Sequence, residues 1–212
     1  MTTGRSKERL VGGLFLAWLI LVGAGLAGMW RYAETAGPAA TASGMWPRAS
    51  HVVRDARRPT LLVFAHPQCA CSRASIGELS ILMTHVQERV TAKVLFYRPS
   101  GEADAWVHSD LWQSAAAIPG VEVAIDEDGT EASVFGAAVS GQTLLYDAAG
   151  DLIFSGGITV ARGHAGDNTG RSALLSLLTN TDATTARTPV FGCFLKGAPT
   201  TSPAMTSTPE KS

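Results

Sequence analysis

One uncharged apolar stretch divides the chain and limits what the rest of it can be. Residues 10–30 read LVGGLFLAWLILVGAGLAGMW. As a helix rising about 1.5 Å per residue, this stretch is long enough to cross a hydrocarbon core about 30 Å thick. Arg5, Lys7 and Arg9 precede it, whereas Arg31 is the only cation close behind it, so the positive-inside rule places the N-terminus in the cytoplasm. We predict a single-pass protein of the cell membrane whose C-terminal domain lies on the exported side, periplasmic or extracellular.

A cleaved signal peptide is the alternative interpretation of this stretch. Small residues at 25–28, or Ala40 and Ala42, suit a signal peptidase. The apolar run is longer than the roughly 7 to 15 residues of a signal-peptide core, which favours an uncleaved anchor. Both interpretations export the rest of the chain.

Composition narrows the class of the exported part. The chain has 212 residues, which suggests one globular domain with extensions. Its 17 Lys and Arg residues balance 18 Asp and Glu residues, so there is no broad positive field to attract nucleic acid. Three cysteines are too few for a disulfide-stapled scaffold, so each cysteine needs its own explanation.

Apolar periodicity predicts alternating strands and helices between two poorly patterned segments. Strands are expected at 60–65, 94–97, 121–125, 143–146 and 152–154, and helices at 72–90, 102–117 and 172–178. The first three strands are joined by helices and are nearly continuously apolar, which is typical of a buried parallel sheet. The chain is thus predicted to divide into a cytoplasmic N-terminus 1–9, a transmembrane helix 10–30, a linker 31–58, an α/β domain 59–180 and a Thr/Ser/Pro-rich tail 181–212.

Two cysteines stand where the first predicted strand gives way to the long helix. Cys69 and Cys71 lie in the sequence HPQCACS, with Ser72 at or next to the helix N-cap. The exposed N–H groups and positive dipole end of the helix stabilise a thiolate there, and Arg73 adds a cation. At least one of the two thiols is therefore expected to have a lowered pKa and to be reactive near neutral pH.

The strand TLLVFAH, the cysteine loop, the amphipathic helix and the later hairpin TLLYDAAGDLIFSGG resemble the thioredoxin-like superfamily. The resemblance covers about residues 58–180 and is strongest to the membrane-tethered, exported branch that includes TlpA-type and RedB-type proteins. It implies a three-layer sandwich with a mixed sheet, preceded by one transmembrane helix. It also implies a thiol-disulfide oxidoreductase without a cofactor, in which Cys69 attacks and Cys71 resolves, acting on thiols or disulfides of exported proteins.

The sequence departs from the usual Cys-x-x-Cys motif by having a single residue between its cysteines. Side chains at i and i+2 of a helix point to nearly opposite sides, so a Cys69–Cys71 disulfide requires Cys69 to lie in the loop and would be strained and labile. The alternative is exchange of one of the pair with Cys193, which stands in the apolar run 189–195 of the tail. Because the preceding strand carries no acid, proton transfer would fall to another base, for which His66 is the candidate.

The predicted topology also suggests what surrounds the cysteines. The end of the first strand, the start of the hairpin and its exit open at one edge of the sheet, which would bring Gln142 and the loop after Gly156 close to Cys69. That loop offers Arg162, His164, Asp167 and Asn168 for contacts with a partner.

Two other functions remain open. Cys69, Cys71 and a histidine such as His66 or His164 would make a soft site suited to Cu(I), so a copper-binding metallochaperone of the same fold is the main alternative. An inactive scaffold that only holds a partner is the third. The oligomeric state is not predicted.

Overall fold

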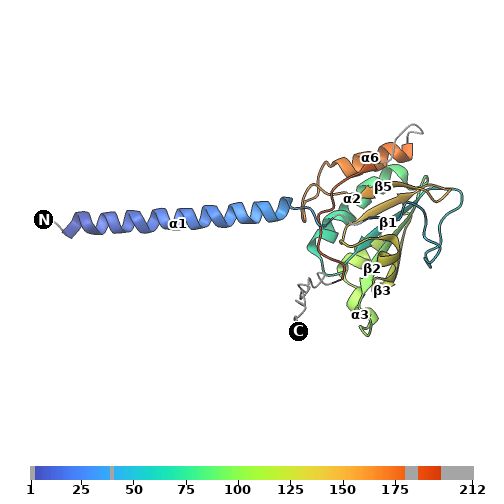
Figure 1. The fold of residues 1–212 in the computed structure, drawn as a ribbon, viewed down its shortest axis with the longest axis horizontal. Coiled ribbons are helices and arrows are strands. Elements are labelled where there is room, and N and C mark those ends of the chain that lie inside the picture. Colours follow the sequence, from blue (N-terminus) through green and yellow to red (C-terminus); the bar gives the residue numbers. More distant parts are fainter. Residues whose placement is uncertain (1–2, 39–40, 180–185, 197–212) are drawn as a thin grey trace, which may run out of the picture.

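The computed structural model describes residues 3–38, 41–179 and 186–196, and of the predicted tail therefore only the part 186–196. One long helix, α1 (Thr3–Glu34), projects from one side of an α/β domain (Figure 1). Its segment Glu8–Glu34 is long and apolar enough to cross a membrane, a property that a signal sequence shares. The apolar side chains of α1 are exposed, as expected for a helix whose surroundings would be lipid.

A six-stranded mixed sheet forms the middle layer of the domain. Its strands are β1 (Thr60–Ala65), β2 (Thr91–Arg98), β3 (Val121–Glu127), β4 (Thr143–Tyr146), β5 (Leu152–Gly156) and β6 (Ala186–Arg187), in the order β3-β2-β1-β4-β5-β6. The pairs β1–β2 and β2–β3 are parallel, β4 is antiparallel to both β1 and β5, and β6 is parallel to β5. β1 is buried along its whole length, as its unbroken apolar run predicts.

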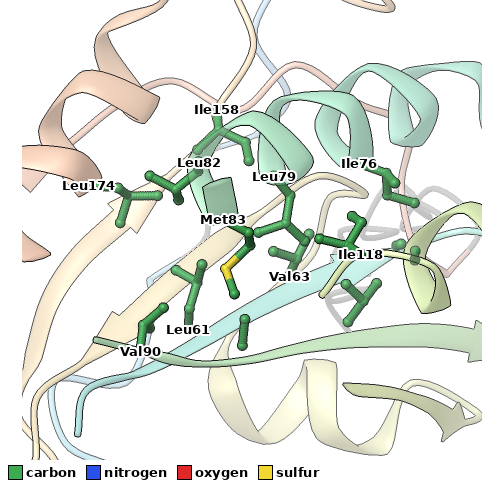
Figure 2. Close-up of a cluster of buried hydrophobic side chains, with 14 of the residues drawn as sticks. Leu61, Val63, Ile76, Leu79, Leu82, Met83, Val90, Ile118, Ile158 and Leu174 are labelled. Atoms are coloured by element: carbon green, nitrogen blue, oxygen red, sulfur yellow. The ribbon is translucent and has the colours of Figure 1, made fainter. Parts of the chain in front are cut away.

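Helices cover both faces of this sheet. One face of the sheet is covered by the helices α2 (Ala70–Val86), α4 (Asp110–Ala116) and α6 (Thr169–Thr179). Leu61 and Val63 of β1 point to this face and join the same apolar core. Figure 2 shows side chains of α2 pointing at this face, and each fully buried aliphatic side chain contributes about 1.5–3 kcal/mol to folding. The opposite face of β1 packs against α5 (Thr130–Phe135) and Leu195. The predicted three-layer α/β sandwich with a mixed sheet is confirmed.

The helix predicted over 102–117 is interrupted. It consists of a single turn, α3 (Asp104–Val107), followed by α4, because His108 leaves helical geometry with ψ 56°. The hydroxyl of Ser109 then accepts a hydrogen bond from the Trp112 N–H and starts a new helix. The elements α5 and β6 were not predicted, because both are too short to show a period.

The predicted linker packs on the domain. The Trp46 ring lies against those of Phe135 and Tyr146, with centroid distances of 4.9 and 5.2 Å. The backbone N–H of Trp46 donates to Gly150 O at 2.8 Å. Closer to α1, the Gly37 N–H donates to Val190 O at 2.7 Å. The segment after α1 is therefore fastened to the domain at several points, and does not act as a loose spacer there.

Candidate functional site: three converging thiols

The two neighbouring cysteines occupy different backbone conformations. Cys69 is the N-cap of α2, with the extended dihedrals φ −99° and ψ 121°, whereas Cys71 lies in the first turn of the helix. β1 delivers the chain to this point, and the N–H of Ser72 donates to Cys69 O at 3.0 Å as the helix begins. Cys69 therefore meets the sequence-based requirement that it lie outside the helix if the pair is to approach each other.

The third cysteine reaches the same place from the other end of the chain. The sulfur atoms of Cys69, Cys71 and Cys193 all lie within 4.8 Å of one another, and all three thiols are unoxidised. Cys69 and Cys71 each retain 8% of their exposure, while Cys193 is exposed. Solvent therefore reaches the cluster mainly at Cys193, because the side chains of the other two cysteines are buried.

We call residues 186–196 the C-terminal strap. Its Cys193 carbonyl accepts a hydrogen bond from the Ser140 N–H at 2.8 Å, and its Leu195 N–H donates to Ala138 O at 3.0 Å. Val139 and Phe194 form an antiparallel β-bridge between these two bonds. The strap is therefore held by its backbone to the loop that precedes β4, and this attachment sets Cys193 beside Cys69.

The environment favours the thiolate of Cys69. Burial opposes its ionisation, but the N–H groups of Ser72, Cys193 and Cys71 and the thiol of Cys193 stabilise the charged form more strongly, so the pKa of Cys69 is lowered. These donors act although the sulfur makes no capping hydrogen bond of regular geometry. The predicted lowered pKa is thus assigned to the first cysteine of the pair.

The other two thiols hold their protons. Burial, followed by the negative charges of Cys69 and Cys193, raises the pKa of Cys71 to about 11. Burial and the hydrogen bond to Cys69 also raise the pKa of Cys193. Of the three thiols, Cys69 is therefore the one that ionises most readily, and the thiols on each side of it have raised pKa values.

Arg162, in the loop after β5, is a cation close enough to the site to offset part of the rise in the pKa values of Cys71 and Cys193. Arg73, the predicted cation, instead forms an exposed ion pair with Asp110 at 2.6 Å. The sequence placed Arg162 only among possible partner contacts, because nothing in its local pattern shows that its loop folds back onto the cysteines.

His66 stands beside the site without joining the sulfur cluster. Its ring stacks on Tyr97 at 5.8 Å and meets Trp106 edge-on at 5.4 Å. Burial lowers the pKa of His66, and its Nδ1 accepts a hydrogen bond from the Gln68 N–H at 3.2 Å. The imidazole is therefore neutral near pH 7, with its proton on Nε2. The soft ligands that the structure brings together are the three cysteine sulfurs, with Cys193 where His66 was predicted.

Gln142 and His164, also predicted near the site, have structural contacts. The Gln142 side chain is buried, accepts from the Ala138 N–H at 3.2 Å and donates to Gly136 O at 3.4 Å, so it shapes the loop that holds the strap. His164 is exposed, and its Nδ1 lies 2.7 Å from Arg162 O. His164 is outside the sulfur cluster too.

A buried carboxylate that the sequence analysis did not identify fixes the loop carrying Arg162. Glu78 of α2 is completely buried, forms an ion pair with Arg171, and accepts hydrogen bonds from the Gly166 N–H at 2.6 Å and the Asn168 side chain at 3.1 Å. The sequence did carry a signal for Glu78, because it lies on the face of the predicted helix that is otherwise apolar. A carboxylate buried there needs hydrogen-bond or ion-pair partners. Ser140 was missed as well; its hydroxyl accepts from the His66 N–H at 2.9 Å.

No model of a known protein family matches the chain, and no curated protein matches it. Among solved structures, hypothetical protein SMc02350 of Sinorhizobium meliloti 1021 is similar at 18% identity and a TM-score of 0.55, over 76% of this chain and 97% of that one. An uncharacterized conserved protein of Geobacillus kaustophilus is similar at 14% identity and a TM-score of 0.52, over 78% and 94% of the two chains. These likenesses concern the fold.

A secreted disulfide oxidoreductase of Mycobacterium tuberculosis, described as homologous to E. coli DsbE, is less similar: 16% identity and a TM-score of 0.39, over 58% of this chain and 81% of that one. The topology is nonetheless specific. A β1-α2-β2 unit of parallel strands is followed by an antiparallel β4–β5 hairpin that pairs with β1, and the cysteines stand at the start of α2. The domain has a thioredoxin-like fold, as predicted.

Proposed function

We propose that this protein is a thiol-disulfide redox protein, fixed to the membrane by α1, that acts on exported partner proteins through Cys69. The observation that carries the proposal is the convergence of three unoxidised thiols within 4.8 Å, with the pKa lowered only at the one that caps a helix. A thiol that ionises more readily than its two neighbours suits exchange chemistry, in which a thiolate attacks and a second thiol resolves the mixed disulfide.

The reaction balances without a cofactor. The Cys69 thiolate attacks one sulfur of a partner disulfide, forming a mixed disulfide and releasing the partner's other sulfur as a thiolate. Cys71 or Cys193 then loses its proton and attacks the Cys69 sulfur, which releases the second partner thiolate. The partner gains two electrons and the protein holds one disulfide; the reverse sequence oxidises a dithiol partner.

We also propose that the reaction takes place at the exported side of the cell membrane. The apolar length of α1 supports an anchor, and the cations before it support a cytoplasmic N-terminus with the domain exported. Residues 58–180 and the tether together resemble the exported TlpA-type and RedB-type proteins, and we propose that branch for this chain. The partners would be thiols or disulfides of exported proteins.

Equilibration of the full chain in detergent with glutathione buffers, followed by alkylation and mass mapping, tests the proposed chemistry. We expect one intramolecular disulfide that contains Cys69, and a rapid reaction with a small disulfide. The Cys69→Ser variant should react no faster than a denatured control, whereas Cys71→Ser should retain the first attack. A wild-type chain that forms no disulfide across the buffer series, or a fully reactive Cys69→Ser variant, would refute the proposal.

The sulfur cluster itself supports a second candidate function, retention of Cu(I). Thiolates are soft ligands that select this ion, and three sulfurs within 4.8 Å are close enough for one ion to contact them all. Titration with Cu(I) against a competing chelator tests this function. Stoichiometric binding that is lost in both Cys69→Ser and Cys193→Ser would support it, and binding no tighter than that of an alkylated control would exclude it.

A further inference from the structure

The end of α1 lies against the same arginine that borders the thiols. The Arg162 N–H donates to Ala33 O at 3.0 Å, its Nε donates to Thr35 O at 3.2 Å, and its guanidinium lies 4.8 Å from the centroid of the Tyr32 ring. The other end of that guanidinium donates to Gly192 O, next to Cys193. One side chain therefore joins the end of α1 to the strap that carries a reacting thiol.

A second attachment repeats this link a few residues later. Gly37 donates to Val190 O, and a Cβ at Gly37 would lie 2.8 Å from a Val139 methyl group, so the segment after α1 presses closely against the strap and its loop. Gly37 is the third residue after Glu34, and Cys193 is the third residue after Val190. Each such step spans at most about 10 Å, so Cys193 stands within roughly 25 Å of the end of α1.

The end of α1 also marks where a membrane surface would lie. Trp30 and Tyr32 are both exposed there, at the close of the apolar run, and such aromatic residues settle at the boundary between lipid and water. A domain of this size is roughly 35 Å across. Arg162 binds both Ala33 O and Gly192 O, so a single arginine spans the gap between the end of α1 and the residue before Cys193. The thiols thus lie on the bilayer side of the domain, and not at its distal end.

From this geometry we infer that the partner presents its reacting disulfide or dithiol close to the exported face of the same membrane, as a membrane-anchored protein does. A thiol site close to the lipid meets such partners by diffusion in two dimensions, whereas a soluble partner must approach the bilayer surface from solution. The inference rests on the proposed function and on α1 as an anchor.

Reporters of defined height test this inference. The full chain is reconstituted in phosphatidylcholine vesicles, and outward-facing molecules are counted by an impermeant thiol reagent. Two single-span peptides carry the same disulfide loop, one directly after the span and one on a rigid Pro-rich spacer of about 20 residues, near 60 Å long. We expect reduction of the loop next to the membrane to be about tenfold faster, because its effective concentration at the site is higher.

A matched pair of variants tests the role of the attachment. Gly37→Val should displace the segment from Val139 and reduce the preference for the loop next to the membrane at least threefold, while Gly44→Val, at a position with open space, should keep it. Equal rates for the two peptides, or faster reduction of the distant loop, would overturn the inference. A soluble small disulfide is measured in parallel, because a wild-type chain that fails to react with it refutes the proposed function instead.

Discussion

At the residue scale, a single intervening residue separates two thiols of opposite character. Cys69 is extended and receives N–H groups from the start of α2, while Cys71 is helical, buried and flanked by negative charge. Because an N-cap places its side chain near the unpaired donors of the first turn, the same residue type ionises easily at one position and poorly two residues later. The single-residue spacing of HPQCACS thus separates the roles of the two cysteines.

The lowered pKa of Cys69 predicts the pH dependence of its first attack. The rate with a small disulfide should rise about tenfold per pH unit at low pH, as the thiolate fraction grows. It should level off below the pH at which an unperturbed thiol ionises, because ionisation at Cys69 is complete earlier. Stopped-flow measurement on a Cys71→Ser, Cys193→Ala variant isolates this thiol. Loss of the Cys193 thiol as a donor should shift the plateau to higher pH than in Cys71→Ser. A plateau at the ordinary thiol pKa in Cys71→Ser contradicts the prediction.

At the element scale, two connections assemble the site: the C-terminal strap bound to the loop before β4, and the loop after β5 bound to α2 through Glu78. Neither connection is a regular strand pairing or a helix packing face. The strap depends on the absence of a side chain at Gly192, and the loop after β5 depends on the buried ion pair of Glu78 with Arg171. Single substitutions at Gly192 or Glu78 can therefore test each connection without changing a cysteine.

Gly192→Ala should detach the strap. A Cβ at Gly192 would collide with the backbone oxygen of Ser140, so the chain must move away and carry Cys193 from the cluster. We expect alkylation of Cys193 to become severalfold faster and Cys69–Cys193 crosslinking by a short bifunctional reagent to decline. Gly44→Ala, at an open position, is the matched control and should change neither measurement. An unchanged crosslinking yield in Gly192→Ala would show that the strap is not held as described.

Glu78→Ala should destabilise the domain by about 3 kcal/mol, since it leaves Arg171 half-buried without its main partner and frees the Gly166 N–H. Urea unfolding of the full chain in detergent, followed by near-UV circular dichroism, measures the change. Glu88→Ala on the exposed side after α2 should cost less than about 0.5 kcal/mol. Equal midpoints for the two variants would assign Glu78 no structural role.

At the scale of the whole molecule, local patterns predicted the fold and half of the candidate site. The apolar run of β1, the helical spacing of Leu79, Leu82 and Met83, and the cysteines at the junction are properties of neighbouring residues, which a sequence displays directly. Arg162 and the docking of the strap are not, because they bring together residues 33, 162 and 192, and no periodicity records a contact of that range. His66 is adjacent to the cysteines in the sequence, and its ring packs against Tyr97 and Trp106, so its role as a base stays a prediction.

Arg162 binds carbonyl groups of residues 33, 35 and 192, which are far apart in the sequence. A ribosome makes them in that order, so the cysteine at 193 follows all the other residues of the site. Until the strap is made, Cys69 and Cys71 lack the third thiol. Synthesis of the strap is thus the event that closes the sulfur cluster, and a product truncated before residue 186 would lack both Cys193 and the carbonyl group of Gly192 that Arg162 binds.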